Sequence, residues 1–254
     1  MPGRADESAI IQPGAGRLRS SAGGPRTDRG ALLYSRHVVF RSAPGYLRAA
    51  GESNPRLWGQ PTVWNGHSVK IDLDTGLLSA ARHIPSPNCD GRSAGDLDLI
   101  VIHGISLPPG EFGGRWIEDL FTNQLDPAAH PYFEQIRDLR VSTHLLIRRD
   151  GELLQFVPFH RRAWHAGPSE YQGRPRCNDY SVGIEMEGCD EIPYSRVQYR
   201  RLAEAVRTLV DAYPGLSRDR IVGHEHISPG RKTDPGPAFD WVMLERLLHS
   251  PRRS

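Results

Sequence analysis

The sequence has few cysteines, no long apolar run and almost no excess of charge of either sign. Its three cysteines, Cys89, Cys177 and Cys189, lie far apart and form no C-x-x-C pair, so they carry no zinc-finger pattern. Such a sparse, odd count is typical of a reducing compartment. No window approaches the run of about 20 apolar residues that a membrane span needs. With 32 Lys+Arg against 30 Asp+Glu, neither nucleic acid nor a membrane surface is the expected partner.

The first 68 residues are poor in apolar residues and rich in Gly, Pro, Ser, Ala and Arg. A segment of this composition cannot bury enough surface to offset the cost of ordering it. We therefore interpret residues 1–68 as a disordered extension, or as the product of a start site assigned too far upstream. The N-terminus also has no apolar stretch of the kind that a secretory signal needs, which predicts a cytoplasmic protein.

Residues 69–254 have the pattern of one folded domain. Residues 97–104, LDLIVIHG, are nearly all apolar and predict a central strand that is buried on both faces. Residues 141–159 predict two strands joined by a turn at Asp150-Gly151. Residues 180–188 alternate strictly and predict a half-buried strand. On that strand one face carries Val182, Ile184 and Met186, and the other carries Gly183, Glu185 and Glu187.

Helices are predicted between and after these strands. The clearest covers residues 194–215, where apolar residues recur at helical spacing until Pro214-Gly215. Shorter ones are predicted around residues 115–125 and 130–139, and a C-terminal one over 240–250 with Asp240 as its N-cap. Strands interspersed with helices indicate a mixed α/β or α+β domain.

Two histidines and an aspartate could form a metal site. His103 ends the apolar run 97–104, and loops that follow such strands commonly open onto a cleft. His224 and Asp234 lie in the segment 222–237, which is rich in Gly and Pro and is not expected to be helical. Two His and one Asp match a catalytic zinc site, which leaves a fourth position for water. Taken alone, His103 is better explained as an ordinary histidine at a strand end. The H-x-H pair of His224 and His226, either of which could be the ligand, is about equally well explained by a charged, solvated loop.

Other residues could complete a hydrolase. A water that attacks an amide needs a base and a group that stabilises the oxyanion. Glu185 suits the first role if the polar face of its strand lines a cleft, and Lys232 suits the second. The plainer alternatives are the solvent side of a strand and one basic residue among 32. His165 follows a tryptophan in a segment that we expect to face substrate, and His144 is either a further candidate or a packed core histidine.

Four long segments closely resemble one known family. They are residues 101–133, 139–159, 162–188 and 223–241, within a similarity that runs from about Leu77 to Leu248. The family is AmpD, the cytoplasmic 1,6-anhydro-N-acetylmuramoyl-L-alanine amidases of cell-wall recycling. Blocks of this length are far more specific than a short motif.

The resemblance implies the type 2 N-acetylmuramoyl-L-alanine amidase fold, a mixed central β-sheet flanked by helices, for residues 69–254. It implies an enzyme that uses Zn²⁺ to hydrolyse the bond between the lactyl group of anhydro-N-acetylmuramic acid and L-alanine in an anhydromuropeptide. We also expect the protein to be a monomer. By the same resemblance, the zinc ligands are His103, His224 and Asp234; the catalytic residues are Glu185, rather than Glu187, and Lys232; and the substrate contacts are Arg140, His165 and Arg176.

The sequence departs from the family pattern at two positions. Gly104 stands where the family more usually has Asn, and His226 belongs to an H-E-H that replaces the more typical H-C-N. A side-chain contact is therefore lost at residue 104, and His226 is either its replacement or a bystander. Two alternatives to the recycling enzyme are a binding module without catalysis and a periplasmic amidase that acts on intact wall. The first conflicts with the presence of all five metal and catalytic residues.

Overall fold

The computed structural model of the 254-residue chain describes residues 69–92 and 97–251. The expectation of a disordered segment over residues 1–68 lies outside these residues. Within the described part, no helix has the length and apolar character needed to cross a membrane.

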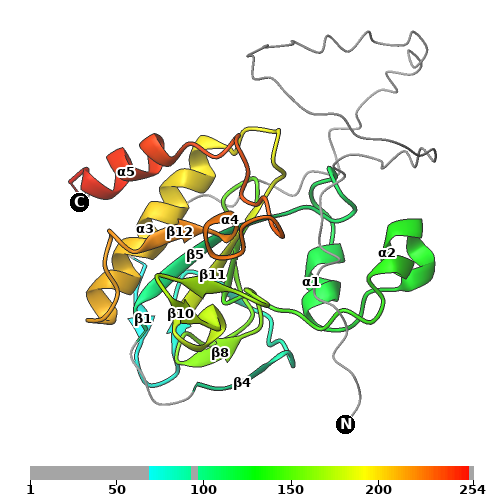
Figure 1. Cartoon of the computed structure of the whole chain (residues 1–254), viewed down its shortest axis with the longest axis horizontal. Coiled ribbons are helices and arrows are strands. Elements are labelled where there is room, and N and C mark those ends of the chain that lie inside the picture. The colour runs from blue at the N-terminus through cyan, green and yellow to red at the C-terminus, as the bar shows by residue number, and fades with distance from the viewer. Residues whose placement is uncertain (1–68, 93–96, 252–254) are drawn as a thin grey trace, which may run out of the picture. The chain divides into compact units, whose positions relative to one another are not determined.

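A six-stranded sheet forms the centre of the domain (Figure 1). Its order is β12-β5-β11-β6-β7-β3, and β6 and β7 are antiparallel while every other neighbouring pair is parallel. This mixed sheet confirms the predicted fold class. The strands are β12 (Ile221–Gly223), β5 (Leu99–Ile105), β11 (Ser181–Glu187), β6 (Leu145–Ile147), β7 (Leu153–Gln155) and β3 (Arg82–His83).

The turn between β6 and β7 contains the predicted Asp150-Gly151. Gly151 has a φ of +88°, a conformation that favours glycine. A Cβ at this position would also crowd Val197 of the neighbouring helix. The hairpin prediction is therefore confirmed, and glycine is required there for two separate reasons.

Strand β11 is not half-buried, as its alternating pattern predicts, but buried along its whole length. It lies between β5 and β6, which pair with both of its edges, while α3 covers one of its faces. The other face is covered by the ring of His165 at Gly183 and by Arg148 at Glu187, and these residues lie too far away in the sequence for the alternation to reveal them. Glu185 and Glu187 are accordingly 8% and 1% exposed.

One face of the sheet packs against helices α3 (Arg196–Ala212) and α5 (Trp241–His249). Ile100 and Ile102 of β5 and Ile184 of β11 point to this side. Ser195 caps α3 through the amide of Gln198, whose side chain bonds back to the Ser195 amide. Asp240 caps α5 as predicted, by accepting from the Met243 amide.

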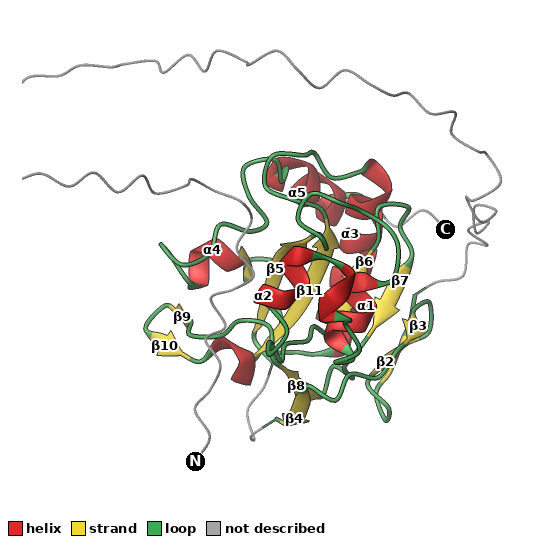
Figure 2. Cartoon of the chain, turned by 90° about the vertical axis from the view of Figure 1, so that its right-hand side faces the viewer, coloured by secondary structure: helices red, strands yellow, loops and turns green. Residues whose placement is uncertain are grey.

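The opposite face carries shorter elements, which Figure 2 shows in front of the sheet. Helices α1 (Trp116–Phe121) and α2 (Pro131–Gln135) are shorter than predicted and are joined through the 3-10 helix η2 (Pro127–Ala129). They form a second apolar cluster with residues of β6 and β7. A third, smaller cluster covers Leu99 and Val101 of β5 and includes residues of the 3-10 helix η3 (Cys177–Asp179) and of α4 (His224–Ile227).

The one-turn helix α4 contradicts the expectation that the segment 222–237 contains no helix. A four-residue turn fits between Gly223, which begins it, and Ser228-Pro229-Gly230, which follows it. Three two-stranded ribbons complete the domain: β1 (Ile71–Asp72) with β2 (Leu77–Leu78), β4 (Cys89–Gly91) with β8 (Arg161–Ala163), and β9 (Glu170–Tyr171) with β10 (Arg174–Pro175).

Candidate active site

The register of the two central strands brings His103 and Glu185 together. Strands β5 and β11 are parallel, and their register places Glu185 beside His103 and Gly183 beside Val101. Residues directly paired across a sheet share a face, so both side chains project from the side opposite α3 and α5. Their adjacency therefore depends on strand pairing rather than on distance along the chain.

His224 and Asp234 reach the same point from the segment after β12. His224 is the first residue of α4, and the amide of Glu225 donates to the Asp234 carbonyl, which fixes the two ends of the segment to each other (3.0 Å). His103 Nδ1 lies 3.0 Å from His224 Nδ1, and Asp234 Oδ2 lies 3.2 Å from both nitrogens. All three residues are buried. The structure thus brings the three predicted metal ligands together.

The donor set fits a metal cation. His224 Nε2 lies 3.1 Å from the Ala166 carbonyl, which can only accept, and 3.4 Å from Arg231 Nη2, which can only donate; the shorter contact favours a ring proton on Nε2. His224 Nδ1 then directs a lone pair toward the same point as the Asp234 carboxylate. The three ligand atoms lie within 4.8 Å of one another, as a shared ion requires.

Electrostatics favour the metal-binding protonation states of His103 and Asp234. Burial, and to a smaller extent the neighbouring His224, lowers the pKa of His103 to about 4, so the ring is neutral at neutral pH. Burial alone would raise the pKa of Asp234, but His224 and His103 outweigh it and hold that pKa well below its usual range. A neutral imidazole and an ionised carboxylate are the metal-binding forms.

The two glutamates of β11 have different surroundings. Burial raises the pKa of Glu185 well above its usual 4.5, the charge of Asp234 raises it further, and Lys232 opposes both. Its Oε2 is buried without a hydrogen-bond partner among the described residues. Glu187 instead binds the Gly113 amide (2.7 Å), the Arg149 amide (2.9 Å) and the Arg148 guanidinium (3.1 Å). Glu187 is therefore held in structural contacts, whereas Glu185 faces the pocket.

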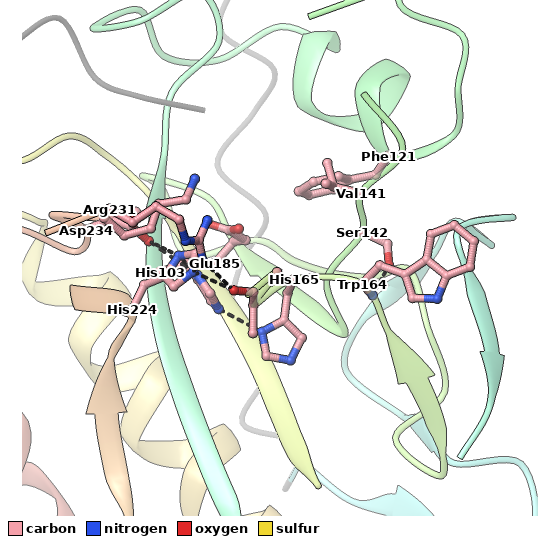
Figure 3. A pocket seen from close by; sticks show the side chains of 14 residues that line it. His103, Phe121, Val141, Ser142, Trp164, His165, Glu185, His224, Arg231 and Asp234 are labelled. Atoms are coloured by element: carbon pink, nitrogen blue, oxygen red, sulfur yellow. Dashed lines mark hydrogen bonds and ion pairs between the residues drawn. The ribbon is translucent and has the colours of Figure 1, made fainter. Parts of the chain in front are cut away.

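A pocket opens beside the ligands (Figure 3). His103 and Glu185 lie on one side of it, with Phe121, Val141 and Trp164 across from them. The buried Lys232 also lines this pocket. The sequence reasoning did not identify Arg231, which also lines the pocket and whose Nη2 donates to the Ala166 carbonyl (2.7 Å). Its only signal in the sequence is its place beside Lys232.

His165 lies in the pocket wall, but both of its ring nitrogens have partners within the protein. Nδ1 lies 2.9 Å from His103 Nε2, and Nε2 lies 3.1 Å from Ser181 Oγ. His144 is a packed histidine: its Nδ1 accepts from the Gly183 amide (3.0 Å), and burial lowers its pKa to about 3. The core interpretation of His144 is thus the one that fits the structure.

Among the described residues that line the pocket, neither Arg140 nor Arg176 is present. Arg140 Nη1 donates to the carbonyls of Arg137 and Leu139 at 3.1 Å each. Arg176 pairs with Asp179, and its side chain is 77% exposed. Their role as substrate contacts stays a prediction.

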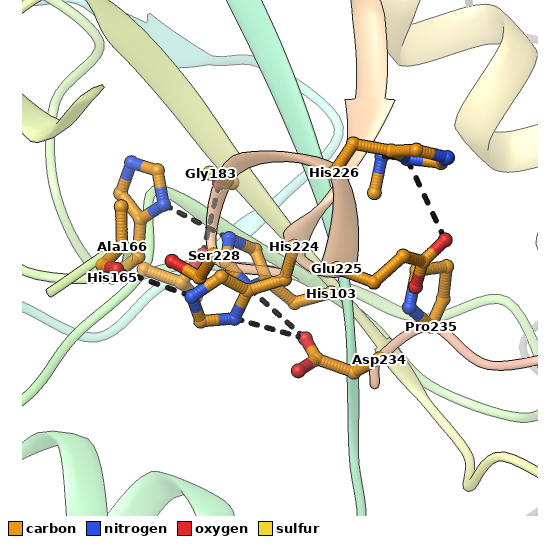
Figure 4. Close-up of polar contacts among 12 residues, drawn as sticks. His103, His165, Ala166, Gly183, His224, Glu225, His226, Ser228, Asp234 and Pro235 are labelled. Atoms are coloured by element: carbon orange, nitrogen blue, oxygen red, sulfur yellow. Dashed lines mark hydrogen bonds and ion pairs between the residues drawn. The ribbon is translucent and has the colours of Figure 1, made fainter. Parts of the chain in front are cut away.

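The two departures from the family pattern have separate structural explanations. His226 points away from the three predicted metal ligands (Figure 4), with its Nδ1 accepting from the Gly223 amide (2.9 Å) and its ring against Trp241. It is a bystander to the site. A Cβ at Gly104 would overlap the Tyr194 hydroxyl, which donates to the Pro235 carbonyl at 3.0 Å. Tyr194 therefore occupies the space that a side chain at residue 104 would need.

Comparisons with known proteins show the family to which the chain belongs. The sequence model of the family described as N-acetylmuramoyl-L-alanine amidase matches residues 93–237. The chain is 56% identical over 177 residues to 1,6-anhydro-N-acetylmuramyl-L-alanine amidase AmpD of Escherichia coli K12, covering 69% of this chain and 96% of that protein. It is 51% identical over 180 residues to AmpD of Haemophilus influenzae, covering 70% of this chain and 96% of that protein.

Solved structures give the same result. A crystal structure of a selenomethionine AmpD derivative superimposes with a TM-score of 0.68 at 55% identity, covering 70% of this chain and 99% of that one. The solution structure of Citrobacter freundii AmpD gives a TM-score of 0.53 at 53% identity, covering 72% of this chain and all of that one.

Proposed function

The chain belongs to the N-acetylmuramoyl-L-alanine amidase family, within which it groups with AmpD, and we propose that it hydrolyses the bond between the lactyl group of 1,6-anhydro-N-acetylmuramic acid and L-alanine. We further propose that it uses Zn²⁺ and serves peptidoglycan recycling. The observation that carries the proposal is the meeting of His103, His224 and Asp234 beside Glu185 in one pocket. The cytoplasmic setting and the monomeric state stay predictions.

The spacing of the three ligand atoms suits zinc. A tetrahedral zinc ion with nitrogen and oxygen ligands at about 2.0–2.1 Å places those atoms about 3.3 Å from one another. The pairs here are 3.0–3.2 Å apart. When bound in a three-ligand site, zinc supplies Lewis-acid polarisation of the amide carbonyl and acidifies the attacking water.

Glu185 is the base in this proposal. It projects from the same sheet face as His103 and lines the pocket. A pKa raised by burial brings a carboxylate closer to neutral pH, where it is a more effective proton acceptor. Glu185 accepts a proton from the attacking water and delivers it to the departing L-alanine amine, so the carboxylate ends as it began.

Lys232 stabilises the charge that develops on the amide oxygen. The residue is only 8% exposed, lines the same pocket and lies two residues before Asp234. A cation in a site shielded from water acts more strongly on a developing oxyanion than it would in bulk solvent. The opposite wall, with Phe121 and Trp164, offers apolar surface to the substrate.

The test is to incubate the protein with anhydromuropeptides and with muropeptides reduced at the sugar end, with and without a chelator. We expect mass spectrometry to show release of the stem peptide from the anhydro substrate, its loss with chelator, and its recovery when Zn²⁺ is restored. A third set of samples contains intact cell wall. Preferential cleavage of intact wall would favour the periplasmic alternative, and binding without chelator-sensitive release from any substrate would identify a binding module.

A further inference from the structure

Behind the three ligands lies a hydrogen-bonded chain that the proposed mechanism does not use. We propose that Ser181 and His165 are positioning residues that fix the ring proton of His103 on Nε2, so that its Nδ1 offers a lone pair to the metal. This inference rests on the proposed metal site and concerns how the apoprotein prepares it. The proton positions follow from the groups that can only accept or only donate.

This series of hydrogen bonds begins at the Cys177 carbonyl, and that acceptor sets the direction in which each bond donates. Ser181 Oγ lies 2.6 Å from the Cys177 carbonyl, which can only accept, so the single hydroxyl proton of Ser181 points there. Ser181 Oγ must then accept from His165 Nε2, 3.1 Å away. The amide of Tyr180 also donates to the Cys177 carbonyl (3.2 Å), which holds this acceptor in place.

The direction continues to His103. A neutral imidazole carries one ring proton, and in His165 it lies on Nε2. His165 Nδ1 is therefore an acceptor, and it lies 2.9 Å from His103 Nε2. His103 consequently carries its proton on Nε2, and its Nδ1, which faces His224 and Asp234, has none. The opposite tautomer would direct a proton into the metal position.

Neighbouring residues fix the position of the His165 ring. Its backbone amide and that of Ala166 both donate to the side-chain oxygen of Asn178 (3.0 and 2.8 Å). A Cβ at residue 183 would lie 2.5 Å from the His165 ring, so only glycine leaves room for the ring against β11. On one face of that strand, Ser181 therefore binds the ring, Gly183 admits it and Glu185 enters the pocket.

Two substitutions of His165 that are nearly isosteric with each other separate the effect of its hydrogen bond to His103 from the effect of its size. His165→Asn keeps an oxygen near the position of Nδ1 that can accept from His103, whereas His165→Leu has a similar size and no acceptor. Ser181→Ala removes only the hydroxyl and leaves His165 Nε2 without its acceptor. Each variant is first checked for cooperative thermal unfolding in the metal-free state.

The first measurement is long-range proton–nitrogen NMR of the histidine ring nitrogens in the metal-free protein. We expect the Nε2–H tautomer for His103 in the wild type and in His165→Asn, and loss of that single tautomer in His165→Leu and Ser181→Ala. An Nδ1–H tautomer for His103 in the wild type would refute the proposal. If His165→Leu does not fold, Ser181→Ala carries the comparison.

The second readout is Zn²⁺ affinity, measured by competition with a chelator of known affinity. Loss of a group that orients a metal-ligating histidine typically costs about 10–100-fold in affinity. We expect that loss in His165→Leu, a smaller loss in Ser181→Ala and near wild-type binding in His165→Asn. Equal affinity of the Leu variant and the wild type would overturn the inference alone, whereas a wild type that binds no Zn²⁺ would overturn the proposed function itself.

Discussion

Replacing Glu185 with glutamine tests the assignment of the base most directly. Glutamine has nearly the same shape as glutamate but cannot accept a proton from water. The Glu185 Oε2 atom has no hydrogen-bond partner among the described residues, so the substitution breaks no structural contact of that atom. The change should therefore act on the chemistry and leave the fold intact.

The expected loss follows from the role of the residue. A positioned general base contributes about 10²–10⁴-fold to the rate. Since each factor of ten corresponds to about 1.4 kcal/mol, the activation free energy should rise by about 3–5 kcal/mol. We expect this loss in kcat, because the proton moves during the reaction and not on binding.

The free energy of unfolding of Glu185→Gln should rise while its kcat falls. The pKa of Glu185 is raised in the folded state, mainly by burial. As pH rises above the unfolded value, the unfolded state loses its proton first, and the folded state is destabilised by up to about 1.4 kcal/mol per pH unit. Glutamine does not ionise. The metal-free Gln variant should therefore be more stable than the wild type, by a margin that grows from about pH 5 upward until the folded pKa is passed.

The control is the same substitution two residues along the strand. Glu187→Gln weakens the contacts of Glu187 with Arg148 and with the Arg149 amide, and hydrogen bonds to charged groups contribute about 1.5–3 kcal/mol each. We expect lower thermal stability with kcat of the same order as the wild type. The assay combines Zn²⁺ content, steady-state release of stem peptide and thermal unfolding. Near-normal kcat in Glu185→Gln with zinc bound would refute the assignment.

Two further substitutions test other parts of the site. Lys232→Met should lower kcat by about 10²–10³-fold, as loss of one oxyanion-stabilising group does, with zinc content unchanged; a change confined to KM would instead indicate a role in substrate binding. Gly104→Ala should lower the free energy of unfolding by about 1–3 kcal/mol, because its Cβ displaces the Tyr194 hydroxyl from the Pro235 carbonyl. Unchanged denaturant unfolding of Gly104→Ala would show that Tyr194 moves aside without cost.

The sequence indicated several local features that the structure confirms. The helical spacing between residues 194 and 215 predicted α3, Asp150-Gly151 predicted the hairpin turn, and Asp240 predicted the cap of α5. Each depends on side chains within one or two turns of the backbone, so the local sequence is sufficient. The same reasoning overestimated the lengths of α1 and α2. Their apolar residues pack against β6 and β7 without needing a long regular helix.

The sequence by itself determined which residues could bind a metal and, through its resemblance to AmpD, which of them do so in that family. Only the tertiary structure decided how they meet. The register of β5 and β11 sets Glu185 beside His103, and the contact of Glu225 with Asp234 closes the segment that carries His224. The role of Ser181 is likewise invisible in the sequence. It depends on a contact with a histidine 16 residues earlier in the chain, and hydrogen-bond partners at such separations are set by the fold and not by spacing.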